Sequence, residues 1–274
     1  MKQERRKPIA NPFPAQAGEG IKKQEHSTNE TMTASQEINP PTATDADVPA
    51  LRLEQVGRRF GALQAVRNVT FDIARGERRA IIGPNGAGKT TLFNTICGDF
   101  PPTEGRIMLF GEDISGLKPH LRARQGIGRT YQTSLLFTGL TVIENLFLAV
   151  RGAMGNRLSL LKPRNGDAAL AKAWNLADRV RVTNIAEEKI DTVSHGQRRQ
   201  IEVGMALASD PKLLMLDEPA SGLNPEETAD MSFWLKDIKE ELGVTILMVE
   251  HDMNLVGRTA DRVLALANGE VVTV

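Results

Sequence analysis

One eight-residue segment constrains the fold of this chain more than any other feature: Gly83-Pro84-Asn85-Gly86-Ala87-Gly88-Lys89-Thr90. An apolar run at residues 80–82 precedes it, and a helical pattern beginning at Thr91 follows it. A strand, a loop and a helix in this order point backbone N–H groups and the positive helix end at a polyphosphate. We expect Lys89 to reach the β- and γ-phosphates and the Thr90 hydroxyl to help hold Mg²⁺. A flexible glycine-rich turn is the alternative, but the flanking elements favour a nucleoside triphosphate site.

The bulk properties exclude several other classes. The formal net charge is zero over 274 residues, so no strong attraction to nucleic acid or anionic lipid is expected. No apolar stretch approaches the roughly 20 residues that cross a bilayer. The single cysteine, Cys97, cannot form an internal disulfide, and we expect a buried apolar role for it in a reducing, cytosolic setting.

The composition divides the chain into two parts. Residues 1–48 are rich in Lys, Glu, Gln, Thr, Asn and Pro and lack apolar periodicity, which predicts a disordered extension. The true start could be Met1 or Met32. Residues 49–274 are expected to form one nucleotide-binding domain, with strands first and a mostly helical segment at about 118–192. In that segment Thr141 with Glu144 predicts a capped helix start, and Trp174 is expected to be a packing residue.

The final third alternates helices with apolar strands. Strands are expected at residues 213–216 and 244–249, and Asn224-Pro225 opens a helix between them whose predicted buried face is Met231, Leu235, Ile238 and Leu242. Asn268-Gly269 predicts a tight hairpin turn. Strands that alternate with helices indicate an α/β fold with a parallel sheet.

Two carboxylates follow the first of these strands. At the carboxyl end of a parallel strand, Asp217 would reach the Mg²⁺ held by Thr90. Glu218 could activate an attacking water as a general base. A strand ending in Asp-Glu is common by itself, but beside the phosphate loop it favours nucleotide hydrolysis.

Ser194-His195-Gly196-Gln197 opens the helix that precedes this strand. Ser194 with Gln197 forms a capping-box pattern that needs no function. Gly196 in the first turn costs about 1 kcal/mol of helix stability relative to alanine, which suggests that something approaches the backbone closely. A hydroxyl, a glycine backbone and a helix start could together hold a second anion.

Taken together, these motifs resemble the ATP-binding subunits of ABC transporters over about residues 51–274. The resemblance implies a RecA-like P-loop core, an antiparallel β-subdomain and an inserted helical subdomain. It also implies two such subunits, identical or different, that enclose two ATPs, with Ser194, Gly196 and Gln197 of one facing the γ-phosphate on the other. Single positions carry over as well: Phe60 as the aromatic on adenine, Gln132 as the glutamine that senses Mg²⁺ and water, and His251 as the histidine that contacts the γ-phosphate.

Finer details resemble the branched-chain amino acid uptake family, whose close relatives import urea and short amides. These details are the Ser-His-Gly-Gln start, Ser221-Gly222-Leu223-Asn224 in place of the commoner Ser-Ala-Leu-Asp, and Glu250-His251-Asp252-Met253. Asn224 lacks the usual carboxylate, and the end at Val274 is earlier than in most relatives.

The predicted function is therefore an ATPase that powers an importer. The expected partners are transmembrane permeases, a second ATP-binding subunit and, indirectly, a substrate-binding protein, at the cytoplasmic face of the membrane. Lipid or polysaccharide exporters share the catalytic residues and are an alternative. A soluble ABC ATPase that acts on ribosomes or DNA ends is another, which the single domain without sustained heptads disfavours.

Overall fold

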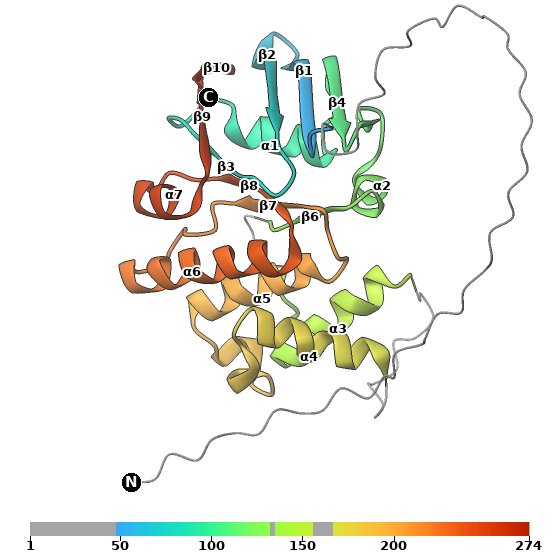
Figure 1. Ribbon diagram of the computed structural model, residues 1–274, viewed down its shortest axis with the longest axis vertical. Helices are drawn as coiled ribbons and strands as arrows, with labels where there is room; N and C mark the ends of the chain where they lie inside the picture. Colours follow the sequence, from blue (N-terminus) through green and yellow to red (C-terminus); the bar gives the residue numbers. More distant parts are fainter. Residues whose placement is uncertain (1–47, 132–134, 156–166, 274) are drawn as a thin grey trace, which may run out of the picture. The chain divides into compact units, whose positions relative to one another are not determined.

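The computed structural model describes residues 48–131, 135–155 and 167–273. The predicted disordered extension lies outside these residues except for Val48. Figure 1 labels the elements of the described part, which are β1 (Leu51–Phe60), β2 (Leu63–Ile73), β3 (Arg78–Ile82), α1 (Lys89–Cys97), β4 (Glu104–Leu109), β5 (Glu112–Asp113), α2 (Pro119–Arg124), β6 (Ile127–Arg129), α3 (Val142–Ala153), α4 (Ala168–Arg179), α5 (His195–Leu207), β7 (Leu213–Asp217), α6 (Pro225–Leu242), β8 (Thr245–Val249), α7 (Met253–Thr259), β9 (Arg262–Ala267) and β10 (Glu270–Thr273). Short 3-10 turns lie at Thr183–Ile185 and Ile190–Thr192.

The larger sheet has the strand order β10-β9-β3-β8-β7-β6. Its strands are parallel from β9 to β6, and β10 is antiparallel to β9. Asn268 and Gly269 both have positive φ angles, 51° and 81°, as the predicted hairpin turn requires. The predicted α/β class with a parallel sheet is therefore confirmed.

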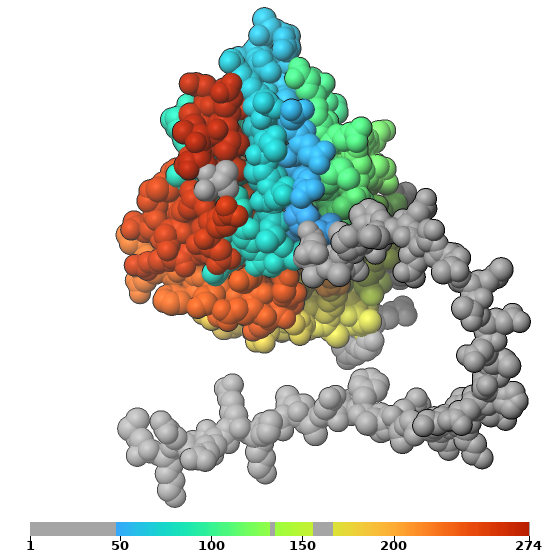
Figure 2. Space-filling model, turned by 45° about the horizontal axis from the view of Figure 1, so that its top comes forward, coloured from blue at the N-terminus to red at the C-terminus, as the bar shows by residue number. Residues whose placement is uncertain are grey.

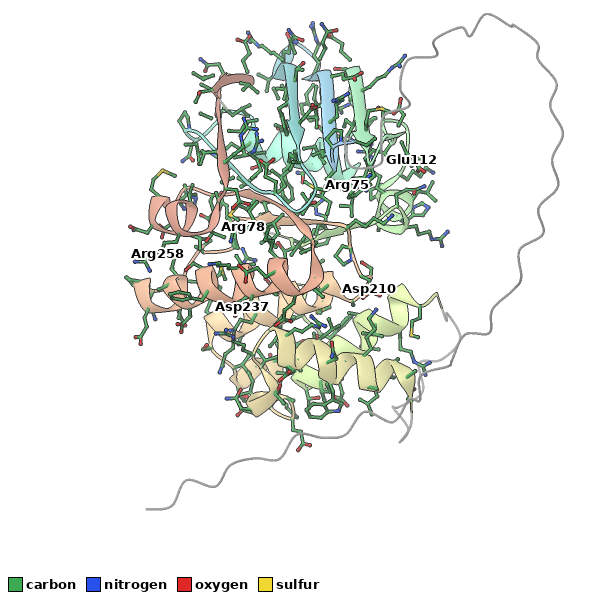
Figure 3. All side chains as sticks on the ribbon, viewed as in Figure 1. Arg75, Arg78, Glu112, Asp210, Asp237 and Arg258 are labelled. Atoms are coloured by element: carbon green, nitrogen blue, oxygen red, sulfur yellow. The ribbon has the colours of Figure 1, made fainter. Side chains whose placement is uncertain are left out.

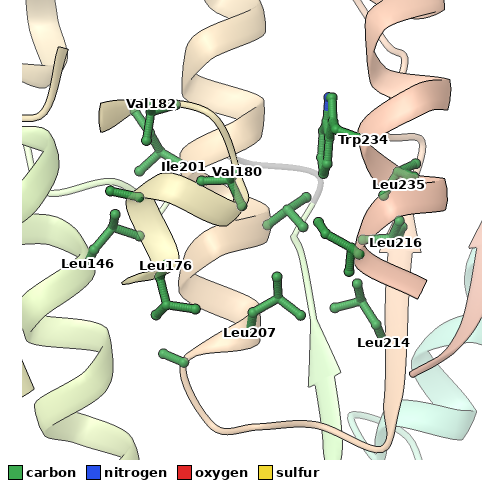
Figure 4. Close-up of a cluster of buried hydrophobic side chains, with 14 of the residues drawn as sticks. Leu146, Leu176, Val180, Val182, Ile201, Leu207, Leu214, Leu216, Trp234 and Leu235 are labelled. Carbon is green, nitrogen blue, oxygen red and sulfur yellow. The ribbon is translucent and has the colours of Figure 1, made fainter. Parts of the chain in front are cut away.

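This sheet is buried on both faces, because alternate residues of its strands enter two different apolar clusters. Leu213 and Met215 pack with α1 and the smaller sheet, whereas Leu214 and Leu216 pack with the helices on the opposite face. Figure 4 shows Leu214 and Leu216 near Trp234 of α6. The continuous apolar runs in the sequence follow from burial on both faces.

The smaller sheet is antiparallel, with the order β2-β1-β4-β5. The space-filling view in Figure 2 shows β1 and β2 side by side, with β10 next to β2. The antiparallel β-subdomain expected from the resemblance is therefore present. Cys97 is buried against Met215 with 3.5 Å between the sulfur atoms, and burial raises the pKa of its thiol to about 12, as a packing role requires.

The segment predicted to be mostly helical, residues 118–192, begins with α2 but also contains a strand. Residues 118–192 include β6, which pairs in parallel with β7 and belongs to the core sheet. Two other predictions were wrong in detail. Trp174 keeps 37% of its surface exposed, and the core tryptophan is Trp234 at 2%. Leu242 is 41% exposed, because it lies on the last turn of α6 at the rim of a small cavity. No helix in the described residues is both long and apolar enough to span a membrane.

Candidate functional site

The glycine-rich loop joins β3, in the middle of the sheet, to α1. Gly88 has a φ of 97°, and a Cβ placed there would lie 2.4 Å from the carbonyl oxygen of Ala65 on β2, so only glycine fits. The Lys89 side chain is buried and spans the loop, since its Nζ donates to the carbonyls of Gly83 at 2.7 Å and Pro84 at 3.1 Å. These two hydrogen bonds hold the loop in a curved conformation.

A cleft of about 780 Å³ lies over this loop. Its volume is in the range typical of small-molecule sites. The structure brings Asn85, Gly86, Ala87, Gly88, Lys89, Thr90 and Thr91 together with Glu218 along its walls, although the loop and the glutamate are far apart in the sequence. Gly83 and Pro84 do not line the cleft, but their carbonyl groups accept the hydrogen bonds from Lys89, which does.

Several residues of the cleft were missed by sequence reasoning: Leu63, Gln64, Ala65, Arg67 and Asn268. Hydrogen bonds across the molecule bring them to the loop. The Gly269 N–H donates to the carbonyl of Ala87 at 2.9 Å, and the Arg67 N–H donates to the carbonyl of Gly269 at 2.7 Å. The Asn-Gly pair predicted a turn, but no local signal indicated that this turn would meet the phosphate loop.

Asp217 ends β7 and is 2% exposed. Its Oδ1 atom is buried without a hydrogen-bond partner. Burial, followed by the neighbouring charge of Glu218, raises the pKa of the Asp217 carboxyl above its ordinary value. A desolvated acceptor of this kind fits a divalent cation. In the described residues no group of three or more His, Cys, Asp or Glu could hold a metal.

Glu218 follows with a φ of 46°, a backbone conformation that is uncommon for any residue but glycine. Its carboxylate is 22% exposed and faces the cleft. His251 lies two residues after β8, and its Nδ1 atom is 3.8 Å from Glu218 Oε1. Two of the residues predicted to be catalytic, which follow different strands of the sheet, therefore lie side by side.

The Ser194 region forms a second, separate feature. Ser194 caps α5 through a complete capping box with Gln197. A Cβ on Gly196 would lie 2.7 Å from Glu227 Oε1, so the close approach expected at this glycine exists, and its neighbour is α6. Ser194, Gly196 and Gln197 line a cavity of about 180 Å³ that shares no lining residue with the phosphate-loop cleft.

Two other predicted residues lie elsewhere. Phe60 does not line the cleft. Its ring is 37% exposed, with its centroid 5.2 Å from that of Phe100 and the Arg58 guanidinium 4.5 Å away. Gln132 lies outside the described residues. Tyr131, next to it, lines an apolar groove of about 330 Å³ together with Leu135, Leu136, Ala149, Met205 and other residues of α3 and α5.

Known proteins with similar sequences and structures indicate the family of this chain. Residues 66–221 match the ABC transporter family. Over 227 residues the chain is 38% identical to the branched-chain amino acid transport ATP-binding protein BraF of Pseudomonas aeruginosa and 37% identical to LivG of Escherichia coli, covering 81% of this chain and 89% of each relative. Among solved structures, MJ1267, an ATP-binding cassette of an ABC transporter, is similar with a TM-score of 0.75 and 29% identity, over 82% of this chain and 90% of that one. A dimeric post-hydrolysis structure of the cassette MJ0796 with ADP and Pi has a TM-score of 0.68 and 26% identity, over 81% and 97%.

Proposed function

The chain belongs to the ABC transporter ATP-binding family, and on this premise we propose that it is the ATP-hydrolysing subunit of an importer for branched-chain or related amino acids. The observation that carries the substrate class is the similarity to BraF and LivG over most of both chains. The cleft that joins the phosphate loop to Glu218 supports the hydrolytic role.

In this proposal, the residues in and around the cleft have different roles in ATP hydrolysis. Residues 83–91 bind the phosphates through backbone N–H groups and Lys89. Thr90 and Asp217, with Gln132, would hold Mg²⁺, which neutralises charge on the transferring phosphoryl group. Glu218 orients the attacking water and accepts its proton, and the neighbouring His251 contacts the γ-phosphate.

Two copies complete the site in this proposal. Ser194, Gly196 and Gln197 line a cavity apart from the cleft, so they would meet the γ-phosphate bound by a second ATP-binding subunit. Phe60 would stack on the adenine from the exposed end of β1. The permeases would dock at the apolar groove beside Tyr131, which places the subunit peripherally at the cytoplasmic face of the membrane.

Purification of the tagged chain from membranes in mild detergent tests this proposal. We expect mass spectrometry to identify two multi-span permeases and a second ATP-binding subunit, which an untagged strain would not yield. Calorimetry of the accompanying binding protein with leucine, isoleucine and valine, against urea and short amides, would then assign the substrate. Co-purification of ribosomal or DNA-repair proteins without a membrane protein would refute the transport function.

A further inference from the structure

Arg199 lies on the second turn of α5 and is only 6% exposed. Its guanidinium donates hydrogen bonds to three separate parts of the chain. The bonds are Nη2 to the carbonyls of Asp217 (2.9 Å) and Glu218 (2.6 Å), Nε to the carbonyl of Pro219 (3.2 Å), and Nη1 to the carbonyl of Tyr131 (3.3 Å) and to Glu202 Oε2 (2.7 Å). A guanidinium group carries its N–H donors on three nitrogen atoms in one plane, so it can bind several separate acceptors at once. An ammonium group has all its donors on one atom and cannot.

Three of these acceptors are the consecutive carbonyls at the point where β7 ends and the chain turns. The turn contains Glu218 with its φ of 46°. A side chain other than glycine persists in such a conformation only where its surroundings over-determine it. The shortest bond of Arg199 is the one to Glu218, so the guanidinium holds the backbone at the strained residue itself.

A second buried charge holds the same turn from its N–H side. Glu250 is fully buried, and its Oε1 accepts from the Ala220 N–H at 2.7 Å. Its Oε2 accepts from the N–H groups of His251 at 3.0 Å and Asp252 at 3.2 Å. Glu250 therefore joins the turn to the His251 loop, whereas Arg199 joins it to α5 and to Tyr131.

We infer that Arg199 is a positioning residue for ATP hydrolysis, which fixes the backbone of residues 217–219 so that the Glu218 carboxylate faces the cleft. Arg199 does not line the cleft, so it acts through Glu218 and not by contact with the nucleotide. The inference rests on the proposed role of Glu218 as the base.

The test compares Arg199→Gln and Arg199→Lys with the wild type in steady-state ATP hydrolysis and in equilibrium nucleotide binding. We expect the kcat of R199Q to fall by about tenfold to a hundredfold, because small displacements of a catalytic group have effects of this size. The kcat of R199K should fall less. KM and the Kd for ATP should stay within about twofold, because the hydrogen bonds of Arg199 go to Tyr131, Glu202 and residues 217–219 and none goes to the phosphate loop. Arg198→Lys is the matched control, because the neighbouring Arg198 donates to the carbonyl of Asp191 and, within the described part of the chain, makes no side-chain hydrogen bond to residues 217–219. It should hydrolyse ATP normally.

The outcomes separate this inference from the proposed function. Normal kcat in both Arg199 variants, beside an inactive Glu218→Gln, would overturn the positioning role alone. Normal turnover in E218Q would refute the role of Glu218 as the base, on which the positioning role of Arg199 depends. A rise in KM and Kd parallel to the loss of kcat would indicate general damage to the fold and would also overturn the positioning role. If R199Q does not fold, R199K decides by the same criteria, since it keeps the charge beside Glu202.

Discussion

At the scale of single residues, His195 and Gly222 occupy complementary space between α5 and the loop before α6. The His195 Nε2 atom lies 3.1 Å from the carbonyl oxygen of Ser221. A Cβ on Gly222 would lie 2.8 Å from the same nitrogen. The His195 imidazole therefore occupies the space that a side chain at residue 222 would need.

This complementarity predicts a coupled pair of mutations. Gly222→Ala should lower the free energy of unfolding by about 1–3 kcal/mol, because the methyl group meets the imidazole and because φ is 78°. The double variant His195→Ala with Gly222→Ala should recover the part of the loss that comes from the contact. Denaturant unfolding measures both.

Gly243→Ala is the matched control, because Gly243 also has a positive φ, 61°, but has open space around it. It therefore reports the backbone cost alone. An equal decrease in the free energy of unfolding in G222A and G243A, or no recovery in the double variant, would show that the imidazole does not exclude a side chain at residue 222.

At the scale of elements, helix starts were predictable because their causes are local. Thr141, Ser194 and Asn224 each accept hydrogen bonds from N–H groups two or three residues later, and each begins the helix that its residue type indicated. The three-residue strand β6 was not predictable, because it is a strand only through its pairing with β7. Elements that depend on distant partners leave little trace in their own sequence.

One such distant link should make stability depend on pH. Asp261, before β9, accepts hydrogen bonds from the Arg78 N–H at 2.9 Å and from Arg78 Nη2 at 2.7 Å at the start of β3; Figure 3 labels Arg78. Although burial opposes ionisation, the bonds from Arg78 hold the pKa of the Asp261 carboxyl below its ordinary value. The folded state therefore binds the proton more weakly than the unfolded chain, so this stabilisation is complete above a pH of about 4 and is lost below it.

Asp261→Asn should accordingly lower the free energy of unfolding by about 1 kcal/mol at pH 7, a value reduced for partial exposure. The difference from the wild type should shrink as the pH falls from about 5 to 3. Urea unfolding across this range measures it, and Asp72→Asn, at an exposed pair with Arg52, is the control with a smaller expected effect. A difference that grows on acidification would contradict the assignment.

At the scale of the whole molecule, the described part of one chain holds a phosphate-loop cleft and, separately, the cavity at Ser194. The proposed sandwich of two subunits would bring each cavity to the other subunit's cleft. The similarity to a dimeric cassette with ADP and Pi supports this arrangement. Hydrolysis would then control how long the two subunits stay together.

Glu218→Gln should therefore retain ATP binding, lose turnover and accumulate as a closed dimer with ATP and Mg²⁺. Sedimentation or size-exclusion chromatography with and without nucleotide measures the dimer. Lys89→Ala should remain monomeric under the same conditions, because it lacks the cation that contacts the phosphates. A monomeric E218Q that still binds ATP would contradict the sandwich, and wild-type turnover in it would refute Glu218 as the base.

Several features could be predicted from the residues alone: the nucleotide loop, the strand followed by two carboxylates, the helix caps and the α/β class. These features depend on residues within a few positions of one another, on strand alternation and on a motif whose spacing carries its chemistry. No local pattern indicated that Asn268 and Arg67 border the cleft, that Trp234 fills the core, or that Arg199 binds the carbonyls at Glu218. Those contacts join segments far apart in the chain, so they form only when the folded chain brings these segments together.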